Sequence, residues 1–325
     1  MCIVINNHKK PFINHKPRFF VQKYQPHYQG QRYLGNVQNS LTTTYQRLSR
    51  GMRINSAKDD AAGLQIADRL TSQINGLNQG NRNASDGIAL AQTVESGMDE
   101  ISGMLQKIRT LAVQASNGTN TAEDKAALSK EASALANEIT RIANQTTFAG
   151  KQILVGQQDN TNTIFSKADN ANKSKAGTMT LQVGSNKGDT ISFQIENMKF
   201  STISSRSDKQ FKLDGTGVVK IDGGVISFQF SKADSSLAIA QMDKMIADVD
   251  GQRANLGAIQ NRLESSIRNQ SNVAANEADA RSRIRDADFA EESANLSQQS
   301  IIQQAAASML MQANTRPQLG LSLLG

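Results

Sequence analysis

Hydrophobic residues recur at steps of three and four along a stretch that begins near Ala67 and ends near Ala112. Such sustained spacing is typical of a helix that packs along another helix, as in a coiled coil. Asn81 fills the one gap, and the phase shifts once near Val94. The pattern therefore predicts a long helix with an alanine-rich seam of about six heptads. Its members are Ala67, Leu70, Ile74, Leu77, Ala84, Ile88, Ala91, Val94, Met98, Ile101, Leu105, Ile108 and Ala112.

The helical period returns from Ser235 and again near the C-terminus. The first of these stretches has its seam at Ile239, Met242, Ile246, Val249, Leu256, Leu263 and Ile267, with Arg253 and Gln260 as polar members. The last holds Ile301, Ile302, Ala305, Ala306, Met309 and Leu310 and is expected to end before Pro317, because proline disrupts a helix interior. We expect the two long seams to pack in an antiparallel or bundled core.

Between the helical stretches the period changes. Thr121 and Asp124 form a capping-box pattern that starts a second helix over about 121–145, and "TTFAGKQIL" indicates a turn into a short strand. Alternating apolar residues flank the turn Asn186-Lys187-Gly188, which predicts a β-hairpin. A second stretch with two Asp-Gly turns repeats the pattern. We therefore expect a mainly α fold: a long antiparallel helical bundle or coiled coil made from the N- and C-terminal regions. A small β-rich central insert, residues 155–232, is expected to project from its far end.

The segment from His8 to Gln31, "HKKPFINHKPRFFVQKYQPHYQGQ", differs from the rest of the chain. Residues 1–35 carry six Lys or Arg and no acid, so removing them leaves 36 − 6 = 30 basic residues against 29 acidic ones. The net charge of +7 thus belongs mainly to this segment, and the main body lacks the basic surplus of a nucleic-acid-binding protein. Three prolines within the segment would cost a helix about 3 kcal/mol each. We expect irregular backbone to about Gln31 and a helix that begins between Asn36 and Leu41.

Candidate catalytic chemistry is sparse. The chain has no histidine after residue 27 and a single cysteine, which excludes Ser-His-acid or Cys-His arrangements in the main body and an internal disulfide framework. Asp59 and Asp60 could bind a metal ion, but adjacent acids at a helix start more often serve the helix dipole. His8, His15 and His27 match no metal-ligand spacing. We expect no enzyme activity, no cofactor and no metal.

Membrane segments are not indicated either. No apolar run approaches the length of about 18–20 residues that a transmembrane helix needs. The beginning of the chain lacks the pattern of a secretory signal peptide. We therefore expect no membrane insertion.

The stretch "QRLSRGMRINSAKDDAAGLQIADRL", from Gln46 to Leu70, resembles bacterial flagellin. The resemblance continues through "NRNASDGIALAQTVESGMDEISGMLQKIRTLAVQASNGTN" and "ARSRIRDADFAEESANLSQQSIIQQAAASMLMQAN". It implies a structural protein that is exported unfolded by the flagellar type III apparatus and polymerises outside the cell into a helical filament for motility. It also implies an export chaperone, the filament cap and hook-junction proteins as partners.

The resemblance assigns parts of the chain to layers of the filament. Residues 36–65 and 283–325 correspond to the innermost filament core, 66–154 and 233–282 to a helical inner domain, and 155–232 to a variable, outward-facing insert. Arg50 stands where the family typically has Ser, and residues 1–35 form an atypical segment that we expect to be disordered. Three alternatives stay open: a hook–filament junction protein, a flagellin with a protease in its middle, and a nucleic-acid- or membrane-binding role for the N-terminus.

Two sets of candidate site residues follow. The first is a self-assembly core of Leu70, Ile74, Ile88, Met98, Leu105, Ile108, Met242, Ile246, Val249, Leu256, Leu263, Ile267, Ile301 and Met309. The second is implied by the resemblance: Lys107, Leu111 and Glu131 match positions that an innate immune receptor grips in many flagellins. Lys107 replaces an Arg there, so we expect weaker recognition. Because the N-terminal segment should leave the last helix without its partner, we expect a soluble monomer that assembles poorly.

Overall fold

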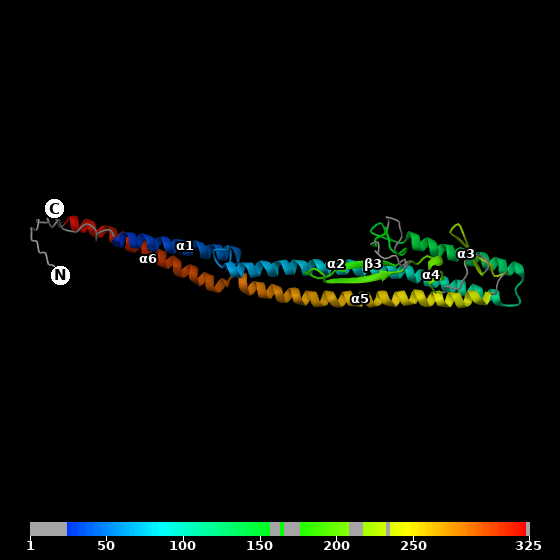
Figure 1. Cartoon of the computed structure of the whole chain (residues 1–325). Helices are drawn as coiled ribbons and strands as arrows, with labels where there is room; N and C mark the ends of the chain where they lie inside the picture. The colour runs from blue at the N-terminus through cyan, green and yellow to red at the C-terminus, as the bar shows by residue number, and fades with distance from the viewer. Residues whose placement is uncertain (1–24, 157–162, 166–175, 208–216, 232–234, 323–325) are drawn as a thin grey trace, which may run out of the picture. The chain divides into compact units, whose positions relative to one another are not determined.

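The computed structural model describes residues 25–156, 163–165, 176–207, 217–231 and 235–322. Within these residues the helices (Figure 1) are α1 (Gln25–Arg50), α2 (Ala61–Ser116), α3 (Ala122–Gln145), α4 (Phe200–Ser207), α5 (Ser235–Arg285) and α6 (Phe289–Ser322). Antiparallel two-stranded sheets are formed by β1 (Thr147–Phe148) with β2 (Lys151–Gln152), β3 (Gly177–Gln182) with β4 (Thr190–Ile195), and β5 (Val219–Asp222) with β6 (Val225–Phe228). The mainly α fold class with small β elements is confirmed.

The chain divides into two compact units, of which the first joins segments from both ends of the sequence and the second is one continuous stretch. The first unit consists of Met1–Arg69 together with Asp279–Gly325, and the second unit is Leu70–Ala278. The insert predicted at 155–232 is therefore not a unit of its own, because its described residues belong to the second unit.

In the first unit, α1 packs antiparallel along α6. Val37, Leu41 and Thr44 of α1 are buried at this contact, and Thr44 Oγ1 donates to Gln299 Oε1 at 3.2 Å. Nearer the other end of the pair, Arg47 forms a 3.0 Å ion pair with the buried carboxylate of Glu292. Polar pairs at the rim thus fix the register of two helices whose seam is narrow.

The expected start of the first helix is wrong. The helix begins at Gln25, not between Asn36 and Leu41. Pro26 is the second residue of α1, and the first turn of a helix tolerates proline because its missing N–H would have no intrahelical partner. The other two prolines of the segment, and the rest of residues 1–24, lie outside the described residues.

The expected end of the last helix is also wrong. We placed it before Pro317, but α6 continues to Ser322. A proline removes one backbone donor and its ring crowds the carbonyl four residues earlier. Near the end of a helix few later turns depend on that bond, so the helix can continue for its last residues.

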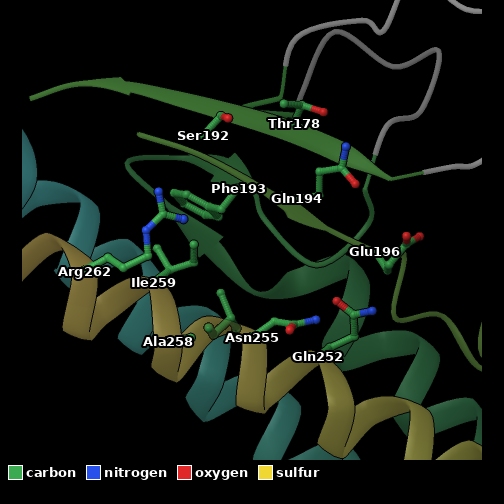
Figure 2. A pocket seen from close by; sticks show the side chains of 11 residues that line it. Thr178, Ser192, Phe193, Gln194, Glu196, Gln252, Asn255, Ala258, Ile259 and Arg262 are labelled. Atoms are coloured by element: carbon green, nitrogen blue, oxygen red, sulfur yellow. The ribbon is translucent and has the colours of Figure 1, made fainter. Parts of the chain in front are cut away.

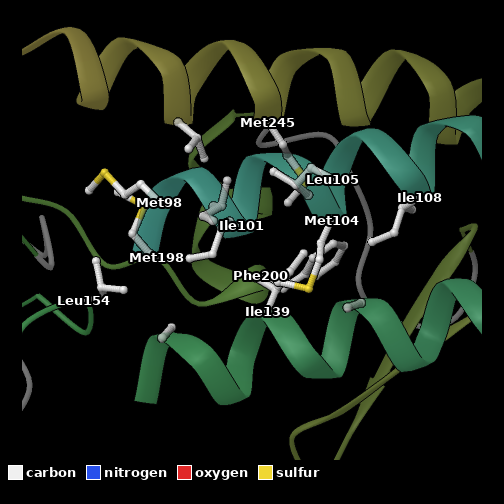
Figure 3. Close-up of a cluster of buried hydrophobic side chains, with 14 of the residues drawn as sticks. Met98, Ile101, Met104, Leu105, Ile108, Ile139, Leu154, Met198, Phe200 and Met245 are labelled. Atoms are coloured by element: carbon white, nitrogen blue, oxygen red, sulfur yellow. The ribbon is translucent and has the colours of Figure 1, made fainter. Parts of the chain in front are cut away.

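The second unit is built around α2, α3 and α5. The predicted capping box is confirmed: the Thr121 side chain accepts from the Asp124 N–H, the Asp124 carboxylate accepts from the Thr121 N–H, and α3 begins at Ala122. Figure 3 shows Met98, Ile101 and Leu105 of α2 in the core between the neighbouring helices, and all three are fully buried. The long seam predicted for α2 therefore forms the central core of this unit.

The central β elements pack into this core instead of projecting from it, which corrects our expectation. Ile195, Phe200 and Phe228 all belong to the same buried cluster as Met98 and Leu105. The sequence pattern identified the hairpins β3–β4 and β5–β6 but not the short helix α4. Each hairpin has only two strands and would be marginal alone, so its apolar face must be buried against helices.

A row of small residues on α2 receives the β3–β4 hairpin. A Cβ atom placed on Gly76 would lie 2.7 Å from Cβ of Ser185, and one placed on Gly80 would overlap the carbonyl group of Val183. One turn further along, Asn83 Nδ2 donates to the Gln182 carbonyl at 2.9 Å. The hairpin backbone therefore approaches α2 more closely than any residue larger than glycine would allow at these positions.

The second hairpin is fastened by a ladder of polar side chains on α3. Ser129 Oγ accepts from Phe230 N–H at 3.0 Å, and Ser133 Oγ accepts from Phe228 N–H at 2.8 Å. Asn137 accepts from Ile226 N–H at 2.9 Å and donates to the Ile226 carbonyl at 3.0 Å. These three side chains are spaced four residues apart and so share one face of the helix. They occupy the outer edge of β6 as a third strand would.

Candidate functional site

The seams of α2 and α5 meet in antiparallel orientation, as predicted. Arg109 pairs with Asp243, Asp99 with Arg253 at 3.0 Å, and Glu95 accepts from Gln260 at 2.9 Å. As the residue number rises along α2, the number of its partner on α5 falls, so the two helices run antiparallel. Hydrogen bonding and the charge of Asp243 raise the pKa of Arg109. Arg253 and Gln260 are the polar members of the α5 seam, and these pairs define the register of the two helices.

Burial divides the predicted self-assembly core into two groups. The residues of the second unit face its interior: Ile74, Met98, Leu105, Ile108, Met242, Val249, Leu256 and Leu263 are buried, and Leu70, Ile88, Ile246 and Ile267 are partly buried. Ile301 and Met309, on α6, are 66% and 72% exposed. The first group therefore packs within the second unit, whereas Ile301 and Met309 lie exposed on the surface of the first.

The face of the α1–α6 pair carries an open apolar groove of about 670 Å³. Its walls are Gln29, Gly30, Tyr33, Ile302, Ala305, Ala306, Met309, Leu310 and Ala313. Small residues line much of it, and a Cβ on Gly30 would lie only 2.9 Å from Cδ1 of Leu310. Exposed Met311 extends the apolar surface along α6. The apolar pattern of the sequence predicts the α6 side of this groove but not the α1 side, because its prolines favour irregular backbone at the start of α1.

The turn before α2 explains the paired acids Asp59 and Asp60. Asp60 Oδ1 accepts from the Gly63 N–H at 2.9 Å, so Asp60 caps α2. Asp59 Oδ2 accepts from the backbone N–H groups of Asn55 at 3.0 Å and Ser56 at 2.9 Å. These backbone hydrogen bonds lower the pKa of Asp59. Both carboxylates therefore have structural partners, in keeping with the helix-start interpretation.

The three positions matched to an innate receptor lie on α2 and α3. Lys107 and Glu131 are exposed, while Leu111 is partly buried against the main core of the second unit. All three belong to this unit, which orders the helices that carry them. Their role in recognition stays a prediction.

Signals for other kinds of site are absent from the part of the chain that the structure describes. No three His, Cys, Asp or Glu side chains there are grouped so that they could hold a metal ion. The described helices also include none that is long and apolar enough to cross a membrane.

The fold is mainly α-helical, and its first compact unit pairs the two terminal regions of the chain. The terminal regions match family models: residues 21–159 match the bacterial flagellin N-terminal helical region, and residues 239–324 match the bacterial flagellin C-terminal helical region. Flagellin B of Vibrio cholerae is 35% identical, covering 91% of this chain and 96% of that protein. Flagellin of Halalkalibacterium halodurans is 37% identical, covering 90% and 95%.

Solved structures agree at the level of fold. A flagellar hook-associated protein from Vibrio parahaemolyticus matches with a TM-score of 0.51 at 17% identity, covering 70% of this chain and all of that one. The chain belongs to the bacterial flagellin family. It is a subunit of the extracellular flagellar filament, which confirms the function and location that the sequence resemblance implied.

Proposed function

We propose that this chain enters the filament through the apolar groove between α1 and α6, with Ile301 and Met309 as the contacts to neighbouring subunits. The observation that carries the proposal is the exposure of large apolar side chains on α6 beside this groove. Contiguous exposed apolar surface marks sites of association. A contact of this kind that does not close into a ring propagates as a helical filament.

The test replaces Met309 with Asp in a strain that expresses only this flagellin. A carboxylate at a contact that becomes buried costs several kcal/mol, so we expect the protein to be exported but filaments to be absent or short in electron micrographs. Gln304→Asp is the matched control, since Gln304 is an exposed polar residue of the same helix and should leave filaments normal. Normal filaments from Met309→Asp would overturn the proposal.

The pairing of α1 with α6 removes the reason to expect poor assembly. We expected α6 to lack a partner, but α1 pairs with it from the region of Gly30 onward. We therefore propose that the chain as written forms filaments. If electron microscopy shows none, and replacing residues 7–24 by a helix-forming segment restores them, the N-terminal segment blocks assembly and the original expectation is right.

The remaining roles extend from family membership. We propose a purely structural subunit without enzymatic activity, handled by a flagellar export chaperone, the filament cap and hook-junction proteins. We also propose recognition by an innate immune receptor through Lys107, Leu111 and Glu131, supported by the exposure of the two charged side chains. Co-purification of the chain with each named flagellar partner from its own cells tests the first group.

A further inference from the structure

The outer edge of β4 borders a groove that no other described element fills (Figure 2). The groove measures about 480 Å³ and lies between the β3–β4 hairpin and α5. On the strand side it is lined mainly by Ser192, Phe193, Gln194 and Glu196, with Thr178 of β3, and on the helix side by Gln252, Asn255, Leu256, Ala258, Ile259 and Arg262. All of these residues belong to the second unit.

The hydrogen-bond register shows what β4 presents to this groove. Val183 N–H donates to the Asp189 carbonyl at 2.9 Å, so these two residues form a hydrogen-bonded pair. Such pairs alternate along an antiparallel ladder. Phe193 therefore bonds to β3, where it pairs with Met179. The N–H and carbonyl groups of Ser192 and Gln194 point away from β3, toward the open edge.

The other hairpin shows how this chain covers a comparable edge. The outward N–H groups of Ile226 and Phe228 in β6 bond to Asn137 and Ser133 of α3. Among the described residues no such ladder serves Ser192 and Gln194. An uncovered strand edge is a template for pairing with another extended chain.

The dimensions and charge of the groove restrict what can pair there. Gln252 and Arg262 lie about 15 Å apart along α5 at a rise of about 1.5 Å per residue, which equals about four or five residues of extended peptide. Partly buried Ile259 supplies apolar contact surface, with the buried ring of Phe193 beside it. Figure 2 places Glu196 near the Gln252 end and Arg262 near the Phe193 end. Glu196 forms an ion pair with Arg206 at 3.7 Å. Arg262, by contrast, forms no ion pair with any described residue.

We propose that this groove binds an extended segment of a partner protein, which adds as a strand to the edge of β4 and places an acidic side chain against Arg262. Main-chain pairing supplies most of the affinity in this mode, and side-chain contacts select the sequence. The proposal does not depend on the assembly role of the α1–α6 groove, because the two grooves lie in different units.

The probe is a fluorescently labelled peptide, acetyl-Thr-Asp-Thr-Val-Thr-Val-amide, titrated into the full-length monomer with anisotropy as the readout. A version with Lys in place of Asp should bind about fivefold more weakly, as expected for one exposed ion pair. In Arg262→Glu this preference should reverse. Arg268→Glu is the control, since Arg268 lies on the same helix outside the groove and is 70% exposed.

Backbone pairing is tested separately with N-methylated peptides. Methylation of one alternate set of amides should abolish binding, and methylation of the other set should be tolerated, because only alternate amides of an added strand face β4. Equal effects of both sets, or an Asp preference that survives Arg262→Glu, would overturn the proposal. A second result would also overturn it: the peptide fails to bind, but the chain forms a dimer that Arg262→Glu abolishes. The occupant of the groove would then be a second copy of the chain.

Discussion

Replacing Gly80 with Ala should destabilise this protein, although the same change in a helix interior normally stabilises. Ala is favoured over Gly in a helix by about 1 kcal/mol. Against this, the new Cβ would overlap the carbonyl oxygen of Val183 and lie 2.6 Å from its carbonyl carbon. The obstacle is backbone, so no side-chain rotation relieves it, and the β3–β4 hairpin must move away from α2.

The free-energy cost of moving the hairpin depends on the apolar side chains that it packs against α2 and α5. Val183 and Ile191 are 6% and 8% exposed and pack with Ala84 and Leu263 in one cluster. Partial loss of this packing, together with the strain of overfilling, costs about 1–3 kcal/mol, and the Asn83–Gln182 hydrogen bond contributes about 1 kcal/mol more. After the helix gain is subtracted, Gly80→Ala should lower the free energy of unfolding by about 2 kcal/mol.

Gly103→Ala is the matched control in the same helix. Apart from the backbone of its own helix and its chain neighbours, no atom lies within 4 Å of a Cβ placed on Gly103, so the variant should gain up to about 1 kcal/mol. Urea unfolding followed by circular dichroism compares the two variants, and amide hydrogen exchange in β3 and β4 reports the hairpin directly. If Gly80→Ala proves as stabilising as Gly103→Ala, the close approach of the hairpin to α2 is refuted.

Four further results are expected. Leu105→Asp should abolish the fold of the second unit, because an unpaired charge at a fully buried site costs several kcal/mol; unchanged melting with normal filaments would contradict the α2–α5 pairing. Asn137→Leu should cost about 2–4 kcal/mol in urea unfolding, since it leaves the N–H and carbonyl of buried Ile226 without partners, and a cost below 1 kcal/mol would refute the ladder. Backbone hydrogen bonds lower the pKa of Asp59 in the folded protein. Its carboxylate therefore stabilises the fold above the ordinary Asp pKa of about 3.9, and this stability is lost as the pH falls through the lowered, folded-state pKa. Amide exchange at Asn55 and Ser56 should accelerate over that pH range in the wild-type protein but not in Asp59→Asn. Lys107→Arg should strengthen signalling in a receptor reporter assay by about fivefold, as one better-formed ion pair would; an unchanged response would refute the argument from the planar Arg side chain.

Local signals in the sequence determined the long helices α2, α3 and α5, the cap of α3 and the hairpin turns, but not α4 or the outer ends of α1 and α6. The α2 seam is periodic over many turns, and its apolar residues have to be buried wherever the helix packs, so the pattern predicts both the helix and its core face. Thr121 and Asp124 bond to each other's backbone across three residues, which is why the start of α3 could be predicted from those residues alone. The antiparallel meeting of α2 and α5 followed from two complementary seams.

Only the tertiary structure decided which apolar residues are buried within the chain and which stay exposed. From sequence alone, Gly80 is a residue of low helix propensity inside a helix. The structure shows why it is glycine there: the carbonyl of Val183, distant in sequence, packs directly against it. Ser133 and Asn137 look like ordinary polar residues of a helix face until the edge of β6 lies beside them. Leu105 and Met309 are apolar members of similar helical patterns, yet one is fully buried and the other is exposed. Periodicity shows that a face is apolar, but the partner that covers it depends on contacts between residues far apart in the chain, which no local pattern encodes.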